Sequence, residues 1–186
     1  MNSISTRLTT QAGADTKQED EHQQFLTFVS AGEVYGVNIL SIKEILEHGE
    51  LTHVPMMPEY VRGVMNLRGS VVPVIDLSVR LGRPVSGVAK RTCIVIIEVR
   101  YENDVLDVGV VVDAVNQVME IAAESIEPAP PFGANIRTDF IAGMGRIQDK
   151  FVVLLDVDHV LSIEELSLLE HTGKVGANLL TENSLA

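Results

Sequence analysis

The sequence predicts a mostly β protein made of two small, related β-barrels with short capping helices. Three observations predict this fold: short runs of β-branched residues between turns, an internal repeat, and a length that suits two halves sharing a core. The chain has 186 residues, enough to bury a core without disulfides or a structural metal. Its single cysteine, Cys93, cannot form an intramolecular disulfide, which excludes the disulfide-rich secreted class.

Strand signals dominate the middle of the chain. Apolar segments typical of strands lie at 25–29, 34–37, 71–75, 93–97, 105–112 and 151–155. The first two flank Gly32 and predict a hairpin, and the segments on either side of residues 102–104 predict a second one.

One short helix is predicted after the first hairpin. Asn38 can cap it, because an asparagine side chain accepts a hydrogen bond from the first helical N–H groups. Four apolar residues then follow at helical spacing, namely Ile39, Ile42, Ile45 and Leu46. We therefore expect Ile42 on the apolar face of a helix.

An internal repeat is the most informative feature. Residues 60–77 align with residues 140–157 at a constant offset of 80 and without a gap. The matched pairs include Gly63 with Gly143, Val72 with Val152 and Asp76 with Asp156. A weaker match at an offset of 73 sets Gly36 on Gly109 and Ile42 on Val115. Two ungapped matches in the same chain order indicate two copies of one β unit, the alternative being chance similarity among valine-rich strands.

Each copy ends in an aspartate that can cap a short helix. Asp76 and Asp156 follow the last strand residue, where a carboxylate can accept the orphan N–H groups of a helical turn. We expect these helices to close the open end of each barrel. Two barrels of roughly 70 residues would each be marginally stable alone, so they should pack against one another.

The two ends of the chain differ from the middle. Residues 1–22 are polar, with almost no large apolar side chain, and are predicted to form a disordered tail. Residues 172–186 are predicted to form a flexible tail. The folded part is therefore expected to span residues 23–171.

Charge is unevenly distributed. The chain carries 14 Lys and Arg against 26 Asp and Glu, a net charge of −12, which argues against broad nucleic-acid binding. Residues 60–91 are the exception, with six basic side chains and one acidic side chain, a net charge of +5. This segment either suits the steering of an acidic protein partner or is a local fluctuation of a solvated surface.

No pattern typical of a membrane protein or an enzyme is found. No apolar run approaches the roughly 18 residues of a membrane-spanning helix, and the first residues do not resemble a signal peptide. The histidines lack metal-pair spacing, and neither a phosphate loop nor a serine elbow occurs. We expect no enzyme, no cofactor, no metal and no direct membrane insertion; an enzyme on a small β-barrel stays as a less favoured alternative.

Polar residues interrupt the apolar strands at one place. Arg62, Asn66 and Arg68 lie there together with Gly63 and Gly69. Gly63 recurs in the second copy and is interpreted as structural, whereas the arginines do not recur. Arg68 is either an exposed turn residue, with Gly69 supplying positive φ, or a fixed fork for a carboxylate.

The segment Arg62–Leu77, with the sequence RGVMNLRGSVVPVIDL, resembles the signature of the CheW family of bacterial chemotaxis adaptors. Supporting pieces are Tyr35–Ile39, Lys43–Ile45, Val111–Asp113 and Glu127–Pro130. The resemblance runs from about residue 24 to residue 169. It implies two SH3-like β-barrels packed side by side and a non-enzymatic scaffold.

The resemblance also implies partners and a location. The partners are the regulatory domain of the histidine kinase CheA and the cytoplasmic tip of chemoreceptors, whose helices dock in an apolar groove between the barrels. The protein is then cytoplasmic and recruited to membrane-associated receptor arrays. An adaptor of the same fold that serves another array, such as one for surface motility, is the alternative. The residues expected to bind receptor or kinase are Ile42, Glu44, Arg62, Gly63, Asn66, Arg68, Gly69, Cys93 and Ile94.

Two of these expectations are specific. Ile42 is expected to line the receptor groove together with Cys93 and Ile94, both from the second barrel. Arg68 is expected to pair with Glu44 at the surface where receptor and kinase meet, so that making and breaking the pair tunes kinase activation.

Overall fold

The computed structural model describes residues 21–101, 103–131 and 137–161. The strands are β1 (His22–Ser30), β2 (Glu33–Asn38), β3 (Ile42–Glu47), β4 (Val61–Leu67), β5 (Ser70–Asp76), β6 (Cys93–Tyr101), β7 (Asp104–Val112), β8 (Ala114–Ala122), β9 (Ile126–Glu127), β10 (Ile141–Ile147) and β11 (Lys150–Leu155). The helices are η1 (Ile39–Ser41), α1 (Leu77–Arg80), η2 (Ala123–Ser125), η3 (Thr138–Phe140) and α2 (Val157–Val160). The prediction of a mostly β fold is confirmed; the two predicted tails lie almost wholly outside the described residues.

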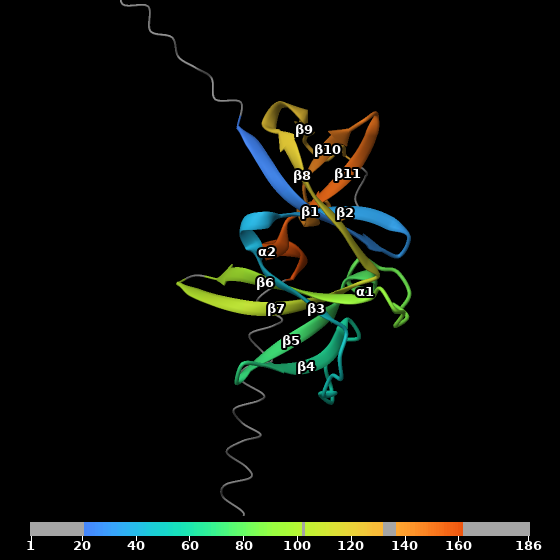
Figure 1. Cartoon of the computed structure of the whole chain (residues 1–186), viewed down its shortest axis with the longest axis vertical. Coiled ribbons are helices and arrows are strands. Elements are labelled where there is room, and N and C mark those ends of the chain that lie inside the picture. Colours follow the sequence, from blue (N-terminus) through green and yellow to red (C-terminus); the bar gives the residue numbers. More distant parts are fainter. Residues whose placement is uncertain (1–20, 102, 132–136, 162–186) are drawn as a thin grey trace, which may run out of the picture.

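The strands form two sheets that lie one above the other, with α2 between them (Figure 1). One sheet has the order β8-β1-β2-β11-β10-β9 and the other has the order β3-β6-β7-β5-β4. Each sheet contains one parallel pair, β11 with β2 and β5 with β7. Among the described strands no ladder joins the two ends of either sheet, so these units are open sheets and not closed barrels.

Each of the two copies of the repeat contributes strands to both sheets. The first copy supplies β1 and β2 to the six-stranded sheet and β3 to β5 to the other sheet. The second copy does the reverse, with β6 and β7 in the five-stranded sheet and β8 to β11 in the six-stranded one. Cys93 and Ile94 therefore share a sheet with Ile42, and the expectation that they come from a different barrel is wrong.

Strand pairing shows that both offsets connect equivalent positions. In the two parallel ladders Val74 pairs with Gly109 and Leu154 pairs with Gly36. Val74 and Leu154 are related by the offset of 80, and Gly36 and Gly109 are related by the offset of 73. The antiparallel hairpins also share an irregularity in register, between Val61 and Gly63 in one and between Ile141 and Gly143 in the other. The two copies thus have the same backbone design.

Both predicted aspartate caps are present. Asp76 accepts hydrogen bonds from the N–H groups of Ser78 and Val79 at the start of α1, and Asp156 caps α2 in the same way. Leu77 and Val160 are buried in the main core between the sheets. The two helical turns therefore join the sheets and do not close the end of a barrel.

The predicted helix from Ile39 to Leu46 is wrong. The Asn38 side chain does accept a hydrogen bond from the Leu40 N–H group, but the helical turn η1 ends at Ser41. From Ile42 the chain is extended as β3 and pairs with β6. Pairing with a buried strand satisfies the backbone, and β-branched isoleucines favour the strand, so tertiary contacts override the helical spacing.

Three apolar clusters form the core. The main cluster lies between the two sheets and draws residues from both, including Phe28, Val37, Val95 and Ile97. Each sheet has a smaller cluster on its other face. One contains Val72, Val74, Ile94, Ile96 and Val111, and the other contains Phe25, Ile121, Val152 and Leu154.

Candidate functional site

All nine expected site residues lie on the five-stranded sheet or on its β4–β5 turn. They do not form one surface. Some line an exposed face, some form an ionic pair at the hairpin tip, and others are held inside the protein.

The expected pair of Arg68 and Glu44 is present at the tip of the β4–β5 hairpin. The two guanidinium nitrogens Nη1 and Nη2 donate to the two carboxylate oxygens, with 2.9 Å between Nη2 and Oε2. Arg68 and Gly69 form the turn with φ values of 51° and 88°, and the Asn66 side chain accepts a hydrogen bond from the Gly69 N–H group at 2.9 Å. The turn therefore fixes the backbone position from which the Arg68 side chain extends.

The pair is ionised and faces solvent. The Arg68 side chain is 75% exposed and that of Glu44 is 23% exposed. The hydrogen bonds from Arg68 lower the pKa of Glu44, and Glu44 in turn raises the pKa of Arg68. A bidentate arginine–carboxylate pair at a surface is specific in geometry and can be opened by a competing partner.

Ile94 does not line a docking surface, because it is 0% exposed within the cluster inside the five-stranded sheet. Successive strand residues point to opposite faces, so Cys93 and Ile94 cannot both face one partner. Cys93 instead packs on the main cluster, like Ile42. The two residues belong to the face of the sheet that is turned towards the other sheet.

Ile45 belongs to the same face and was missed by the sequence analysis. It pairs with Val95, which faces the main cluster, and its side chain is 43% exposed. Strand β3 lies at the edge of its sheet, so Ile42, Ile45 and Cys93 form a partly open apolar surface there. We call these three residues the edge face. The edge face was not predicted, because residues 39–46 were interpreted as a helix.

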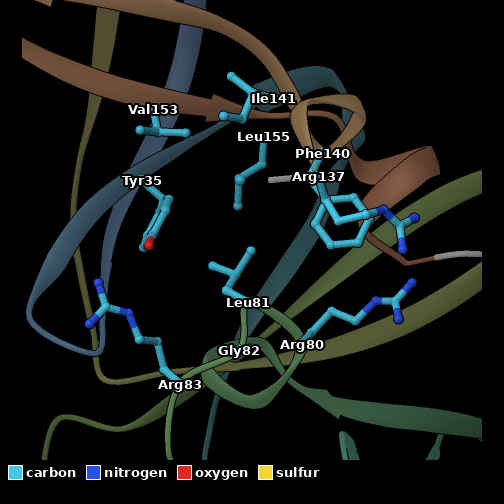
Figure 2. A pocket seen from close by; sticks show the side chains of 10 residues that line it. All are labelled: Tyr35, Arg80, Leu81, Gly82, Arg83, Arg137, Phe140, Ile141, Val153 and Leu155. Carbon is cyan, nitrogen blue, oxygen red and sulfur yellow. The ribbon is translucent and has the colours of Figure 1, made fainter. Parts of the chain in front are cut away.

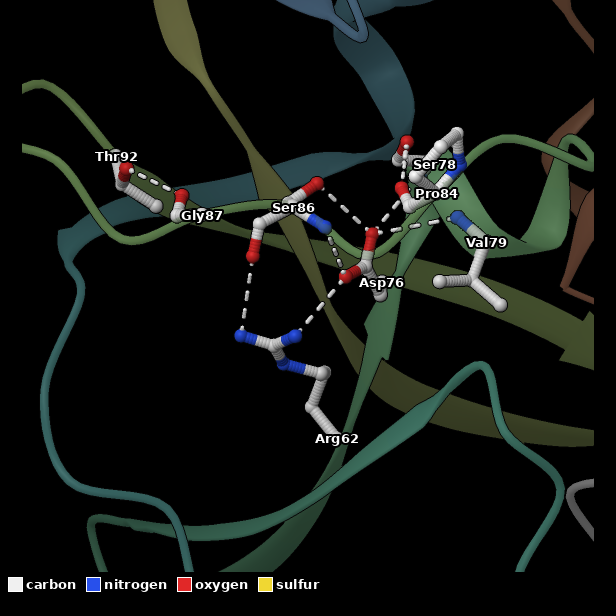
Figure 3. Close-up of polar contacts among 8 residues, drawn as sticks. All are labelled: Arg62, Asp76, Ser78, Val79, Pro84, Ser86, Gly87 and Thr92. Carbon is white, nitrogen blue, oxygen red and sulfur yellow. Dashed lines mark hydrogen bonds and ion pairs between the residues drawn. The ribbon is translucent and has the colours of Figure 1, made fainter.

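Arg62 is held by a buried carboxylate and its surroundings (Figure 3). Asp76 is fully buried, and its Oδ2 accepts hydrogen bonds from Arg62 Nη1 at 3.3 Å and from the Ser86 N–H group at 2.9 Å. Its Oδ1 accepts from Ser86 Oγ at 2.9 Å as well as from the α1 backbone. We call Arg62, Asp76 and Ser86 the Asp76 cluster. Ser86 was missed because it lies in an irregular loop with no sequence pattern.

Gly63 also has a structural role. Its φ of +145° is unfavourable for other residues, and a Cβ atom there would collide with the carbonyl oxygen of Thr52. The backbone of Thr52 exchanges two hydrogen bonds with that of Val64, so this approach is part of the sheet. Gly63 shapes the surface without itself offering a contact group.

A cavity of about 480 Å³ lies between the six-stranded sheet and the segment from Arg80 to Arg83 (Figure 2). It is lined by Tyr35, Arg80, Leu81, Gly82, Arg83, Arg137, Phe140, Ile141, Val153 and Leu155. Burial raises the pKa of Tyr35, and the nearby Arg83 partly opposes this rise. The guanidinium carbons of Arg80 and Arg137 lie 5.1 and 4.4 Å from the centroid of the Phe140 ring. This cavity could not be predicted from the sequence, since its walls come from both copies.

Over the described ranges, no helix is long and apolar enough to cross a membrane. In the same ranges, no group of three His, Cys, Asp or Glu side chains is arranged to hold a metal ion. The features that stand out are surfaces suited to protein contact.

The fold and these surfaces define a class of small two-sheet β scaffolds. Residues 24–165 match the family model described as the CheW-like domain, and the chain belongs to this family. It is 36% identical over 152 residues to chemotaxis protein CheW of Klebsiella aerogenes, covering 82% of this chain and 89% of that protein. It is 33% identical to chemotaxis protein CheW of Helicobacter pylori, covering 81% and 90%.

A solved structure supports the same conclusion. The crystal structure of the scaffolding protein TtCheW from Thermoanaerobacter tengcongensis has a TM-score of 0.68 and 33% sequence identity, and the match covers 77% of this chain and 90% of that chain. The family is one of chemotaxis scaffolds without enzymatic activity. The chain is therefore a non-enzymatic chemotaxis adaptor.

Proposed function

We propose that this adaptor couples chemoreceptors to the histidine kinase CheA in membrane-associated receptor arrays, using the two faces of β3. The observation that carries the proposal is the exposed Arg68–Glu44 pair in a chain of the CheW-like family. A solvent-facing ionic pair adds little to folding, so its bidentate geometry is better explained by contact with a partner.

The edge face is the proposed receptor contact. Ile45 is paired with Val95, so it lies on the side of the sheet that also carries Ile42 and Cys93. An amphipathic receptor helix needs apolar side chains that are open to solvent but held by a rigid element. The partly exposed isoleucines of an edge strand meet both needs.

The Arg68–Glu44 pair is the proposed point where receptor docking is passed to the kinase. Glu44 is the direct neighbour of Ile45 on β3, so a shift of this strand moves the carboxylate against the hairpin tip. A change in the pair would alter the surface that the CheA regulatory domain meets. The mechanism is geometric and needs no chemistry.

Binding to a receptor signalling fragment tests the edge face. We expect Ile45→Asp to lower receptor binding at least about tenfold, because a charge would be buried under the docked helix. Ile42→Asp is less suitable, since Ile42 packs on the main core. The matched control is Val105→Asp, an exposed apolar residue on β7. Equal binding by Ile45→Asp and the control would place the receptor elsewhere.

Ternary-complex signalling tests the ionic pair. We expect Arg68→Glu to impair kinase activation with near-normal folding, and the added Glu44→Arg to restore part of it. A pulldown with CheA and the receptor fragment separates lost assembly from lost activation. If the double variant is as inactive as the single one, the role of the pair is wrong and Arg68 contacts a partner directly.

A further inference from the structure

A loop of basic residues follows α1. Residues 82–91, which we call the basic loop, contain Arg83, Lys90 and Arg91 and no acidic residue. The other arginines of this part of the chain are engaged: Arg62 with Asp76, Arg68 with Glu44, and Arg80 with the Val160 carbonyl oxygen. Among the described residues no carboxylate lies within 4.0 Å of the three basic groups of the loop.

The protein holds the loop backbone in place. Ser86 is buried and bonded to Asp76 through both its N–H group and its hydroxyl, and Arg62 Nη2 donates to the Ser86 carbonyl oxygen at 3.4 Å (Figure 3). Ser78 Oγ donates to the Pro84 carbonyl oxygen at 2.6 Å. The Ala89 N–H group donates to Thr92 Oγ1 at 2.8 Å. Each half of the loop is therefore tied to the folded core.

Apart from Ser86, the residues of the basic loop are exposed, and Arg83 also lines the cavity shown in Figure 2. Val85 is 53% exposed and Val88 is 60% exposed, and Arg83, Lys90 and Arg91 are exposed as well. The loop thus offers cationic and apolar groups from a backbone that is already ordered. Such a surface loses little conformational entropy on binding.

We propose that the basic loop binds an acidic segment of a partner protein. Carboxylates of that segment would pair with Arg83, Lys90 and Arg91, and its apolar side chains would cover Val85 and Val88. The proposal goes beyond the receptor and kinase contacts above and does not depend on them, because it uses neither the edge face nor the Arg68–Glu44 pair.

Charge favours a short protein segment over a membrane or a nucleic acid. Since the loop carries +3 and the whole chain −12, the rest of the chain carries −15. An extended anionic surface would meet that negative charge, whereas a short segment contacts the loop alone. At physiological ionic strength charges interact over about 8 Å, so the loop acts locally within the acidic chain.

A peptide titration of the full chain tests the proposal. The probe is a synthetic peptide of alternating glutamate and leucine, and the matched peptide carries glutamine in place of glutamate. We expect the glutamate peptide to shift the backbone amide resonances of residues 82–91, and the glutamine peptide to bind about tenfold more weakly or worse. Addition of salt should weaken the first peptide more than the second.

Charge-matched variants of the full chain show whether the loop itself binds. Lys90→Glu with Arg91→Glu should lower the affinity for the glutamate peptide about tenfold or more. The control, Arg100→Glu with Lys150→Glu, changes the net charge equally at exposed sites on other strands and should keep most of the affinity. Equal losses in the two variants would reduce the effect to net charge and overturn the proposal.

Three further results would overturn it. The first is the absence of amide shifts in the loop, or shifts confined to other strands. The second is equal binding to phosphatidylglycerol vesicles, which would assign the loop to anionic lipid. The third concerns a full-chain variant with Asp15→Asn, Glu19→Gln and Asp20→Asn. If its loop resonances differ from those of the parent chain before any peptide is added, the occupant of the loop is the chain's own N-terminal segment.

Discussion

The two copies of the repeat have the same backbone but different polar chemistry. Asp76 and Asp156 both cap a helical turn, and both donate their N–H group to the carbonyl oxygen of the equivalent aromatic residue, Tyr60 or Phe140. In the first copy the carboxylate is fully buried and also binds Arg62 and Ser86. In the second copy Ala142 replaces that arginine, and Asp156 pairs with the largely exposed His159 at 3.0 Å.

The hairpin tips show the same contrast. The first tip turns through Arg68 and Gly69, and the second turns through Gln148 and Asp149, all four with positive φ. In the second copy the residues equivalent to Arg68 and Glu44 are Gln148 and Gln117, which carry no charge. The fold therefore forms the same turn without an ionic pair, so the Arg68–Glu44 pair is not required for folding.

This difference separates architecture from function. The features present in both copies are the cap, the register shift and the turn, and they build the sheet. Among the residues that the structure describes, the Asp76 cluster, the basic loop it anchors and the ionic pair are found in the first copy and not in the second. Substituting a residue of one copy and its counterpart in the other should therefore have different effects.

The largest expected difference is between Asp76→Ala and Asp156→Ala. Removing Asp76 leaves Arg62 and two groups of Ser86 without their buried acceptor, which should cost about 3 to 5 kcal/mol of unfolding free energy. Removing Asp156 takes away a more exposed cap and should cost about 1 kcal/mol. Urea unfolding followed by circular dichroism measures both. Equal losses would show that Asp76 is a simple cap.

The next comparison is between Gly63→Ala and Gly143→Ala. A Cβ atom on Gly63 meets the backbone oxygen of Thr52 at a φ of +145°, so the sheet itself must shift, at a cost of about 3 kcal/mol. At Gly143 the φ is not positive, and the nearest backbone atom, the Glu127 carbonyl oxygen, is 3.2 Å away. The Cβ atom first meets the Cγ2 methyl group of Ile126 at 2.6 Å, so a rotation of that side chain is needed and not a shift of the sheet, and we expect a smaller cost of about 1 kcal/mol. Unfolding midpoints in urea test the order, and a larger loss at Gly143 would contradict it.

A third comparison concerns Arg80, whose counterpart in the second copy is Val160. Arg80 Nε donates to the Val160 carbonyl oxygen at 2.6 Å, and its guanidinium lies over the rings of Tyr60 and Phe140. Arg80→Lys keeps the charge but loses the planar stacking and the Nε–H donor. We expect a loss of about 1 to 2 kcal/mol of unfolding free energy.

The control for Arg80→Lys is Arg100→Lys on the exposed end of β6, which should change stability by less than about 0.5 kcal/mol. Both variants keep the net charge, so a difference between them reports the contacts of Arg80. Equal stability of the two variants would mean that Arg80 does not link the copies.

The sequence predicted those parts of the fold that repeat without a gap. Asp76 and Asp156 were found as caps because the offset of 80 holds from residue 60 to residue 77. The correspondence between β1 and β6 was missed. Thr27 pairs with Gly36 in the first hairpin, and Ile96 pairs with Gly109 in the second. Thr27 and Ile96 are 69 positions apart, whereas Gly36 and Gly109 are 73 positions apart. The two hairpins therefore differ in length, and no constant offset runs through them.

The site was predictable where local chemistry decides and not where tertiary contacts decide. Arg68 was expected to pair with a carboxylate because it stands beside a turn, and Glu44 was preferred to Glu47 because it lies in the family-like segment Lys43–Ile45; the Arg68–Glu44 pair is present. Ile45 was placed on a helix because short apolar runs fit both the helical and the strand period. Ser86 could not be linked to Asp76, since only the folded loop brings them together.

The smallest expected effect is the pH dependence of the Arg68–Glu44 pair. Arg68 lowers the pKa of Glu44 below its ordinary value of 4.5. The contribution of the pair to stability is therefore fully present above that ordinary value and is lost as the pH falls through the lowered pKa. The difference in melting temperature between the parent chain and Glu44→Gln should be small at neutral pH and should vanish in acid.

The second copy provides the sharper version of this test. If the shared hairpin geometry is enough to hold an ionic pair, Gln117→Glu with Gln148→Arg should introduce a second pair. That pair should also raise the melting temperature slightly at neutral pH and lose this contribution in acid. High salt should weaken both pairs, because they are open to solvent. The parent pair could depend on pH while the transplanted pair does not. That result would show that the first tip needs more than its two charges to hold the pair. The further requirement would be the hydrogen bond from the Gly69 N–H group to the Asn66 side chain, which holds the turn and orients Arg68.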